Sequence, residues 1–293
     1  MSADVGPPMS VERQAVAAQV LIRASRPRRA RGLGYWAPPF LLFLAFLGVW
    51  YLISYVVLDG DRRFLLPPPH SVVRVAFLDT YSVTELLRGL GLTAQVALLG
   101  LLLAIGIGIT VAVLMSQARW IERSLYPYAV ILQTLPILAM VPLIAFWFGY
   151  GFNARVLVCV LIALFPIINN TLFGLRSVDQ GQCDLFALHR TGRIIRLWKL
   201  QLPAALPAIF AGFRISAGLA VIGAIVGDFF FKQGDPGIGV LIDLYRSRLQ
   251  SEQLIGAVIL SSALGIVVFW FFSFLTKRVV GGWHESALDD PSS

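Results

Sequence analysis

Long apolar stretches alternate with short polar segments along most of the chain. A helix of about 20 apolar residues is long enough to cross the hydrocarbon core of a membrane. The apolar stretches of roughly this length cover residues 38–58, 90–115, 126–149, 154–174, 204–231 and 255–275. The pattern therefore predicts an all-α integral membrane protein with about six transmembrane helices.

The polar segment between the fourth and fifth apolar stretches, residues 183–203, has an amphipathic pattern of its own. Its basic residues recur at every third position, and they are Arg190, Arg193, Arg196 and Lys199. Its apolar residues, expected on the opposite face, are Leu185, Leu188, Ile194 and Leu197. We expect a helix that lies against one membrane face. These residues alone fit a docking element and a solvated linker equally well.

The basic residues of the short loops predict the orientation in the membrane, because Lys and Arg accumulate on the cytoplasmic side. With the N-terminus inside, the interior segments carry an Arg-rich leader, Arg119, Arg123, the 183–203 segment, Lys277 and Arg278. Arg62, Arg63, Arg246 and Arg248 oppose this assignment. We expect a multi-pass protein of the cytoplasmic membrane with both termini in the cytoplasm. Residues 1–34 are expected to form a disordered tail, 35–279 the membrane domain and 280–293 a second tail.

Composition supports the membrane interpretation and argues against other classes. The chain is 57% hydrophobic and 14% charged, whereas soluble domains are about 25% charged. The net charge is +8, and the basic residues lie between the apolar stretches. A role in orienting the protein in the membrane explains these residues better than nucleic-acid binding does. Cys159 lies in an apolar stretch and Cys183 in a polar one, and the histidines have no metal-ligand spacing. We expect neither a disulfide nor a metal site.

Polar residues within the apolar stretches are candidates for a solute pathway. A polar group at that depth must face protein or a water-filled path. The candidates are Gln133, Asn169, Asn170, Ser216 and Asp228. Asp228 should lie about 30 Å from the inner end of its helix, near the outer mouth. The alternative for each residue is an interhelical hydrogen bond, worth about 0.6–2 kcal/mol.

The fifth apolar stretch carries small residues at helical spacing. Gly212, Ser216, Ala220 and Ala224 recur at every fourth position, and Gly223 and Gly227 form a second small pair on an adjacent face. Such spacing lets another helix approach closely. It predicts a packing seam, either between helices or between two subunits.

Several motifs are missing. The sequence contains no GxxxxGK[ST] phosphate loop, no nucleophile elbow, no zinc-protease motif and no chain of buried carboxylates for a proton relay. We therefore expect a protein that is not an enzyme and has no cofactor of its own. A transporter of this kind would take its energy from elsewhere.

A family resemblance enters at residues 202–209, Leu-Pro-Ala-Ala-Leu-Pro-Ala-Ile. Preceded by the amphipathic segment, they resemble the cytoplasmic coupling loop of binding-protein-dependent ABC importer permeases. That loop usually begins Glu-Ala-Ala and has a Gly six residues after the Glu. Here Asp184 stands for the Glu, Arg190 occupies the Gly position and Gly192 follows two residues later.

Other segments resemble the nitrate/sulfonate/taurine branch of that family. They are Leu135-Pro136 with Val141-Pro142-Leu143 and Trp147-Phe148-Gly149, the segments 165–170 and 174–179, and Gly237-Ile238-Gly239. The resemblance implies a permease dimer of two copies or of a copy with a paralogue. It also implies cytoplasmic ATP-binding subunits, which hold the ATP, and an extracytoplasmic solute-binding protein. The solute would be a small anion, such as a sulfonate, taurine or nitrate, or a pyrimidine-type vitamin precursor.

The resemblance also implies a coupling site, which consists of Asp184, Leu185, Phe186, Ala187, Leu188, His189, Arg190, Thr191 and Gly192. We expect the helix to run through Arg190 and its guanidinium to reach the ATPase surface. Two other hypotheses are an ion-coupled secondary transporter and a membrane enzyme or receptor scaffold. A secondary transporter would need intramembrane ion ligands and often an inverted repeat. An enzyme would need a set of catalytic residues. The sequence shows none of these features.

Overall fold

The computed structural model describes residues 33–189 and 191–281, and every regular element within these ranges is helical. The two expected tails lie largely outside the described residues. The first compact unit, residues 1–53, contributes α2, Leu33–Leu52. This helix is apolar on all sides, and its described side chains are mostly exposed. Such a helix suits a lipid environment. The remainder of the chain forms the second unit and is described by itself.

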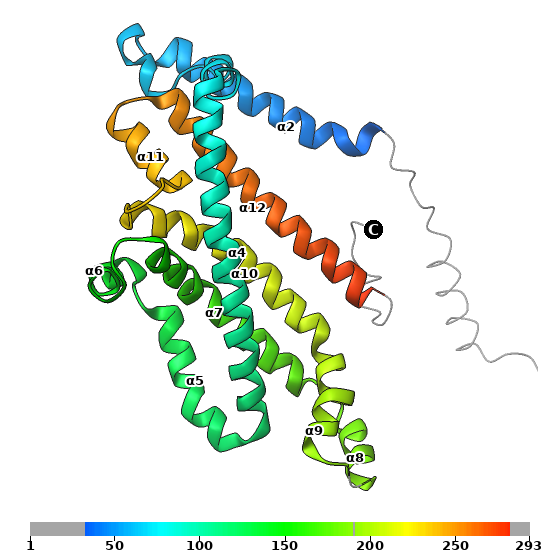
Figure 1. Ribbon diagram of the computed structural model, residues 1–293. Helices are drawn as coiled ribbons and strands as arrows, with labels where there is room; N and C mark the ends of the chain where they lie inside the picture. The colour runs from blue at the N-terminus through cyan, green and yellow to red at the C-terminus, as the bar shows by residue number, and fades with distance from the viewer. Residues whose placement is uncertain (1–32, 190, 282–293) are drawn as a thin grey trace, which may run out of the picture. The chain divides into compact units, whose positions relative to one another are not determined.

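The second unit begins with short helical turns and continues with long helices (Figure 1). A π-helical turn, Ile53–Val57, leads into it and is followed by the 3₁₀ turn Gly60–Leu65, α3, Pro69–Val72, and a π-helical turn, Val73–Leu78. The long helices are α4, Thr80–Gln117; α5, Arg119–Thr134; α6, Ile137–Phe148; and α7, Phe152–Arg176. The last part holds α8, Gln180–Leu188; α9, Arg193–Arg196; a π-helical turn, Leu197–Gln201; α10, Leu202–Phe230; α11, Ile238–Ser247; and α12, Ser251–Val280.

Five segments within the described residues are long and apolar enough to cross a membrane, and a sixth arises if α5 and α6 count as one broken span. The two helices meet at an angle of 102°. The break falls at Leu135 and Pro136, where both residues are extended, because proline disfavours the α region for its predecessor. The all-helical membrane fold is therefore confirmed. The third expected span is bent much more sharply than a single helix.

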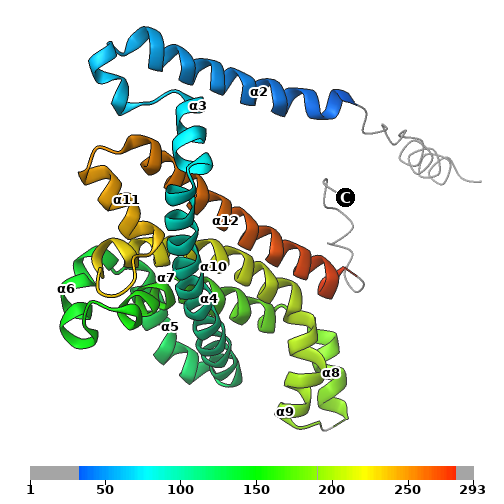
Figure 2. The ribbon, with the colours of Figure 1, turned by 45° about the horizontal axis from the view of Figure 1, so that its top comes forward.

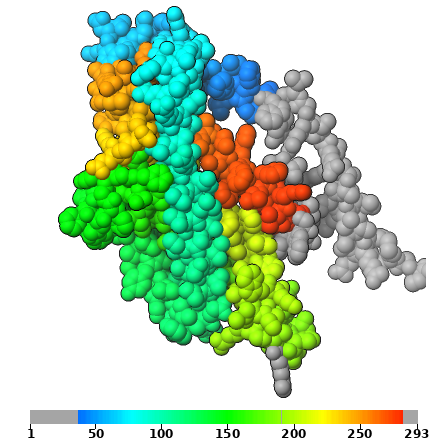
Figure 3. All heavy atoms as spheres, in the orientation of Figure 1, coloured from blue at the N-terminus to red at the C-terminus, as the bar shows by residue number. Residues whose placement is uncertain are grey.

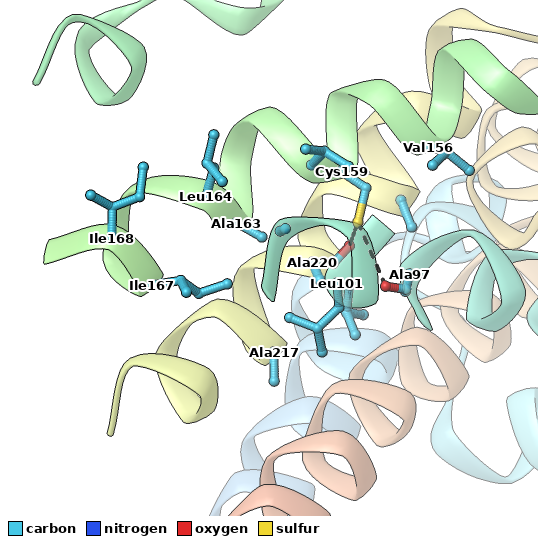
Figure 4. Packing of buried hydrophobic residues seen from close by; sticks show 14 of the residues in the cluster. Ala97, Leu101, Val156, Cys159, Ala163, Leu164, Ile167, Ile168, Ala217 and Ala220 are labelled. Carbon is cyan, nitrogen blue, oxygen red and sulfur yellow. Dashed lines mark hydrogen bonds between the residues drawn. The ribbon is translucent and has the colours of Figure 1, made fainter. Parts of the chain in front are cut away.

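The core lies where α4, α7 and α10 meet, and Figures 1 and 2 show the three helices side by side. Cys159 of α7 sits at the centre of this contact. Its Sγ lies 3.3 Å from the carbonyl oxygen of Ala220 and 3.7 Å from that of Ala97 (Figure 4). A Cβ at Gly100 would lie 2.4 Å from this sulfur, and one at Gly223 would lie 2.9 Å from the Cys159 Cα. The glycines at these two positions therefore let α4 and α10 both pack closely against α7 at Cys159.

The small-residue seam of α10 packs against α7 of the same chain. Gly212 faces Asn170, Gly223 faces Cys159 and Gly227 faces Arg155. In each pair the number on α7 falls by as much as the number on α10 rises, so the two helices are antiparallel and in register. Ser216 donates a hydrogen bond of 2.7 Å to the carbonyl of Ala163 in the same ladder, and Ala220 and Ala224 are buried. The seam accordingly joins two helices within the subunit.

The bundle has two distinct ends. At one end α8 and α9 project beyond the other helices, as the yellow-green atoms of Figure 3 show. Near this end, Arg176 at the end of α7 pairs with Glu122 at the start of α5. The opposite end holds the start of α7, the end of α10 and the whole of α11. We call these the α8–α9 end and the α11 end.

The seam gives a first prediction. Gly223→Ala places a methyl group against the α7 backbone, and overpacking of this kind costs about 1–3 kcal/mol. Gly218→Ala, on the same helix, is the matched control, because its Cβ would meet nothing within 4 Å. We expect Gly223→Ala to lower the midpoint of heat-induced aggregation in detergent and Gly218→Ala to leave it unchanged. Equal midpoints for the two variants would show that the seam is loosely packed.

Candidate functional site: the two polar ends of the bundle

The α8 helix begins and ends at identifiable signals. Asp179 is its N-cap, and its Oδ1 accepts hydrogen bonds from the backbone N–H groups of Gly181 and Gln182 at 2.8 and 3.3 Å. At the other end, the N–H and the hydroxyl of Thr191 both donate to the carbonyl of Phe186, at 3.2 and 2.7 Å. Capping of the last carbonyls by a side chain stabilises a helix stop. The helix therefore ends at Leu188.

This stop corrects the expectation of one helix through residue 190. Thr191 and Gly192 are not helical, and α9 begins only at Arg193. Arg190 itself lies outside the described residues. Gly192 has φ −64° and ψ 155°, a conformation that any residue adopts. The coupling residues thus divide between a helix, Asp184 to Leu188, and the turn that follows it.

The apolar side chains at this end fall into an inward and an outward group. Leu197 is buried against Leu175, Ala205 and Ile209, where α7 ends and α10 begins. The outward group is exposed, with 53% for Leu185, 80% for Leu188, 71% for Ile194 and 68% for Trp198. Leu197 was expected beside Leu188 on one helical face, and the break between α8 and α9 separates them. We call the four exposed residues the α8–α9 apolar surface.

The α11 end contains a buried ion pair that joins α7 to α10. Arg155 Nη1 lies 3.2 Å from Asp228 Oδ1, and the two side chains are 1% and 0% exposed. The hydroxyl of Thr93 on α4 donates to Asp228 Oδ2 at 2.6 Å and accepts from the N–H of Ile238 at 2.8 Å. The N–H of Gly239 donates to the same carboxylate at 3.3 Å. One carboxylate thereby ties together α4, α7, α10 and α11.

Arg155 also fixes the loop between α10 and α11. Its guanidinium donates to the carbonyls of Phe231, Gln233 and Asp235 at 2.7, 3.0 and 3.2 Å. Arg155 is not among the site residues expected from the sequence, because it stands alone in an apolar stretch. The pair could have been predicted from the sequence, because Arg155 lies at the start of one span and Asp228 at the end of another, and buried charges in membrane helices usually pair.

Two glycines after this loop leave room for the carboxylate. A Cβ at Gly237 would lie 2.1 Å from Asp228 Oδ2, and one at Gly239 would lie 2.5 Å from the carbonyl oxygen of Ile225. The glycines of the Gly237-Ile238-Gly239 segment thus allow the start of α11 to lie directly on α10. Any side chain at Gly237 would displace the ion pair.

The second half of α11 is held by further polar contacts. Tyr245 Oη donates to Glu85 on α4 at 2.6 Å, while Asp243 pairs with Lys232 and Arg246. Hydrogen bonds from Lys232 and Arg246 hold the pKa of Asp243 below its ordinary value. The α11 end is therefore fixed by several links to α4 and to the preceding loop.

The candidate pathway residues do not gather in one place. Ser216 and Asp228 are buried in helix contacts, as described above, and Asn170 donates to the carbonyl of Pro166 at 2.8 Å beside Gly212. Asn169 faces Tyr126 on α5, with 3.5 Å between the amide and phenol oxygens. Gln133 is exposed and lines a cavity of about 240 Å³ at the α5–α6 break.

Comparison with known proteins decides the family. Residues 104–281 match the model of the binding-protein-dependent transport system inner membrane component, and this match covers more than half of the chain. The chain belongs to this family. It is therefore the transmembrane permease subunit of an ABC importer, and the expected family is confirmed.

Relatives and a solved structure agree with this assignment. The permease is 31% identical to a probable ABC transporter permease protein of Haemophilus influenzae, over 83% of this chain and 96% of that protein. It is 32% identical to the formylaminopyrimidine transport permease protein ThiX of Halalkalibacterium halodurans, over 79% and 90%. The putative aliphatic sulfonates transport permease protein SsuC of Bacillus subtilis is 28% identical over 90% and 93%. A chain of the inward facing MetNI methionine ABC transporter has the same fold, with a TM-score of 0.61 at 18% identity over 69% of this chain and 99% of that chain.

The buried pair gives a second prediction. Removal of one partner leaves an uncompensated buried charge, which costs about 3–5 kcal/mol. We expect Arg155→Met and Asp228→Leu each to destabilise the permease strongly in detergent, and the double variant to be more stable than either. Arg88→Met, which removes an exposed cation from α4, should have little effect. Additive losses in the double variant would contradict a coupled pair.

Proposed function

We propose that the α8–α9 apolar surface binds a cytoplasmic ATP-binding subunit, which drives solute transport through the permease. On this proposal the α8–α9 end lies in the cytoplasm together with both termini, and the α11 end faces outward toward a solute-binding protein. Two permease copies, or a copy and a paralogue, would form the complete transmembrane part. The family membership supports these partners, since importers of this family work with both kinds of subunit.

The exposure of Leu188 is the observation that carries the proposal. It is 80% exposed on a nine-residue helix that projects from the bundle, together with Leu185 and Ile194. A contiguous exposed apolar patch with charged neighbours marks an interaction site in many proteins. Charged side chains lie on the same projection, since Arg193, Lys199 and Asp184 are exposed there. A partner with an apolar groove and acidic margins would complement both features.

The solute is proposed only as a class. The relatives named above carry a formylaminopyrimidine in one case and aliphatic sulfonates in the other. Both are small polar molecules, which fits a permease that receives its solute from a separate binding protein. We therefore propose a small polar solute, either an organic or inorganic anion or a pyrimidine-type vitamin precursor.

A charged residue at the centre of the proposed docking surface tests it. Leu188→Asp should leave the permease folded, because the side chain is 80% exposed, yet lower association with the ATP-binding subunits at least about tenfold. Leu249→Asp is the control, since Leu249 is 65% exposed at the α11 end and its φ of 56° suits Asp better than Leu. Association is measured by co-purification and by ATPase activity in proteoliposomes. Equal association of Leu188→Asp and wild type would contradict the proposal.

A further inference from the structure

Arg214 is a cation within a transmembrane helix and belongs to neither polar end. It lies 12 residues after the start of α10 and 16 before its last residue. At 1.5 Å per residue these separations are about 18 and 24 Å along the helix. Its side chain is exposed, and the guanidinium carbon lies 5.3 Å from the centre of the Phe269 ring on α12. Charged side chains at such depth usually face a water-filled path or a partner of opposite charge.

Within the described residues, Arg214 forms no ion pair with a carboxylate. Asp228, the acidic residue of α10, is paired with Arg155 and lies 14 residues farther along the helix, about 21 Å away. Glu122 and Glu252 stand in the first turns of α5 and α12, and Glu85 near the start of α4 is hydrogen-bonded to Tyr245 at the α11 end. A second identical copy carries the same residues at the same depths. The described acidic residues of a second identical copy would therefore lie no nearer to the depth of Arg214.

A groove between α10 and α12 opens beside the guanidinium. It has a volume of about 600 Å³ and is bordered by Phe269, the ring that Arg214 covers. Gly218 of α10 and Gly265 of α12 both line it, and a Cβ at either would meet nothing within 4 Å. The hydroxyls of Ser261 and Ser262 add polar atoms on the α12 side. The groove thus has the size of a small-molecule site and a single charged group at its margin.

We propose that this groove is the passage of the solute and that Arg214 binds an anionic group on it. The inference rests on the proposed function and narrows the solute to molecules that carry a carboxylate, sulfonate, phosphate or similar oxyanion. A guanidinium offers two parallel N–H donors to such a group, and the low dielectric of the surroundings strengthens the contact. The aromatic contact with Phe269 keeps the cation at the groove while it is empty.

Iodide provides a test that needs no knowledge of the solute. Trp270 lines the groove and is 69% exposed, so its fluorescence reports anions that enter. Quenching by iodide and by neutral acrylamide is measured on the full permease with its ATP-binding subunits in uncharged detergent. Each variant is also prepared with Trp270→Phe, and the fluorescence of that protein is subtracted so that the signal of Trp270 remains.

We expect the ratio of iodide to acrylamide quenching to fall about twofold or more in Arg214→Gln, because the local positive potential concentrates anions. Arg214→Lys should preserve the ratio, and so should Arg123→Gln, which removes an exposed cation from α5. If Arg214→Gln does not assemble, Ser262→Asp gives the same comparison, since an acidic group in the groove should lower the ratio. An unchanged ratio in Arg214→Gln, or in Ser262→Asp where that variant replaces it, would overturn the proposal.

Competition separates a solute site from a lipid site. Methanesulfonate should suppress the iodide effect on Trp270, whereas phosphatidylglycerol added to the micelles should not. Suppression by the lipid alone would assign Arg214 to a headgroup and overturn the proposal. Association with the ATP-binding subunits is scored in the same samples. If the wild type did not associate with these subunits, the proposed function would be contradicted. The quenching result would still show whether Arg214 attracts anions to the groove.

Discussion

The close antiparallel contact between α7 and α10 is the constraint on which the rest of the structure depends. Small residues at 212, 216, 223 and 227 let the two backbones approach, and Gly100 admits α4 to the same point. In a membrane, helices gain little from apolar burial itself, so packing and interhelical hydrogen bonds hold them together. The contact therefore requires small side chains along its whole length, and it ends in the Arg155–Asp228 pair.

This rigid pair of helices connects two surfaces of different character. Through Leu197 and the start of α10 it carries the α8–α9 apolar surface, and through Asp228 it carries the loop and the start of α11. The third feature, the groove beside Arg214, lies on the side of α10 that faces α12. The α10 helix thus presents two different faces. The face toward α7 carries small residues, and the face toward α12 carries Gly218 beside the cation Arg214.

Much of this arrangement follows from local sequence. The apolar stretches predict the membrane helices, and the spacing of small residues in α10 predicts a close contact, because both are properties of a single helix. The sequence does not reveal the helix stop at Leu188, which depends on the two bonds from Thr191 to Phe186. The importance of Arg155 was equally hidden, since its carboxylate partner lies 73 residues away. The role of Arg214 also depends on the fold, because Phe269 and the groove beside it lie on another helix, 55 residues farther along the chain.

Labelling of the native Cys183 tests the central claim, that the α8–α9 end is the cytoplasmic docking end. Cys183 lies on α8 and is partly exposed, while Cys159, the other cysteine of the chain, is buried and serves as an internal blank. A membrane-impermeant maleimide is applied to right-side-out and inverted vesicles, and the purified permease is then assayed. The account predicts modification in inverted vesicles alone, with slower modification when the ATP-binding subunits are present. Modification from the outer side, or a rate that the ATP-binding subunits leave unchanged, would contradict it.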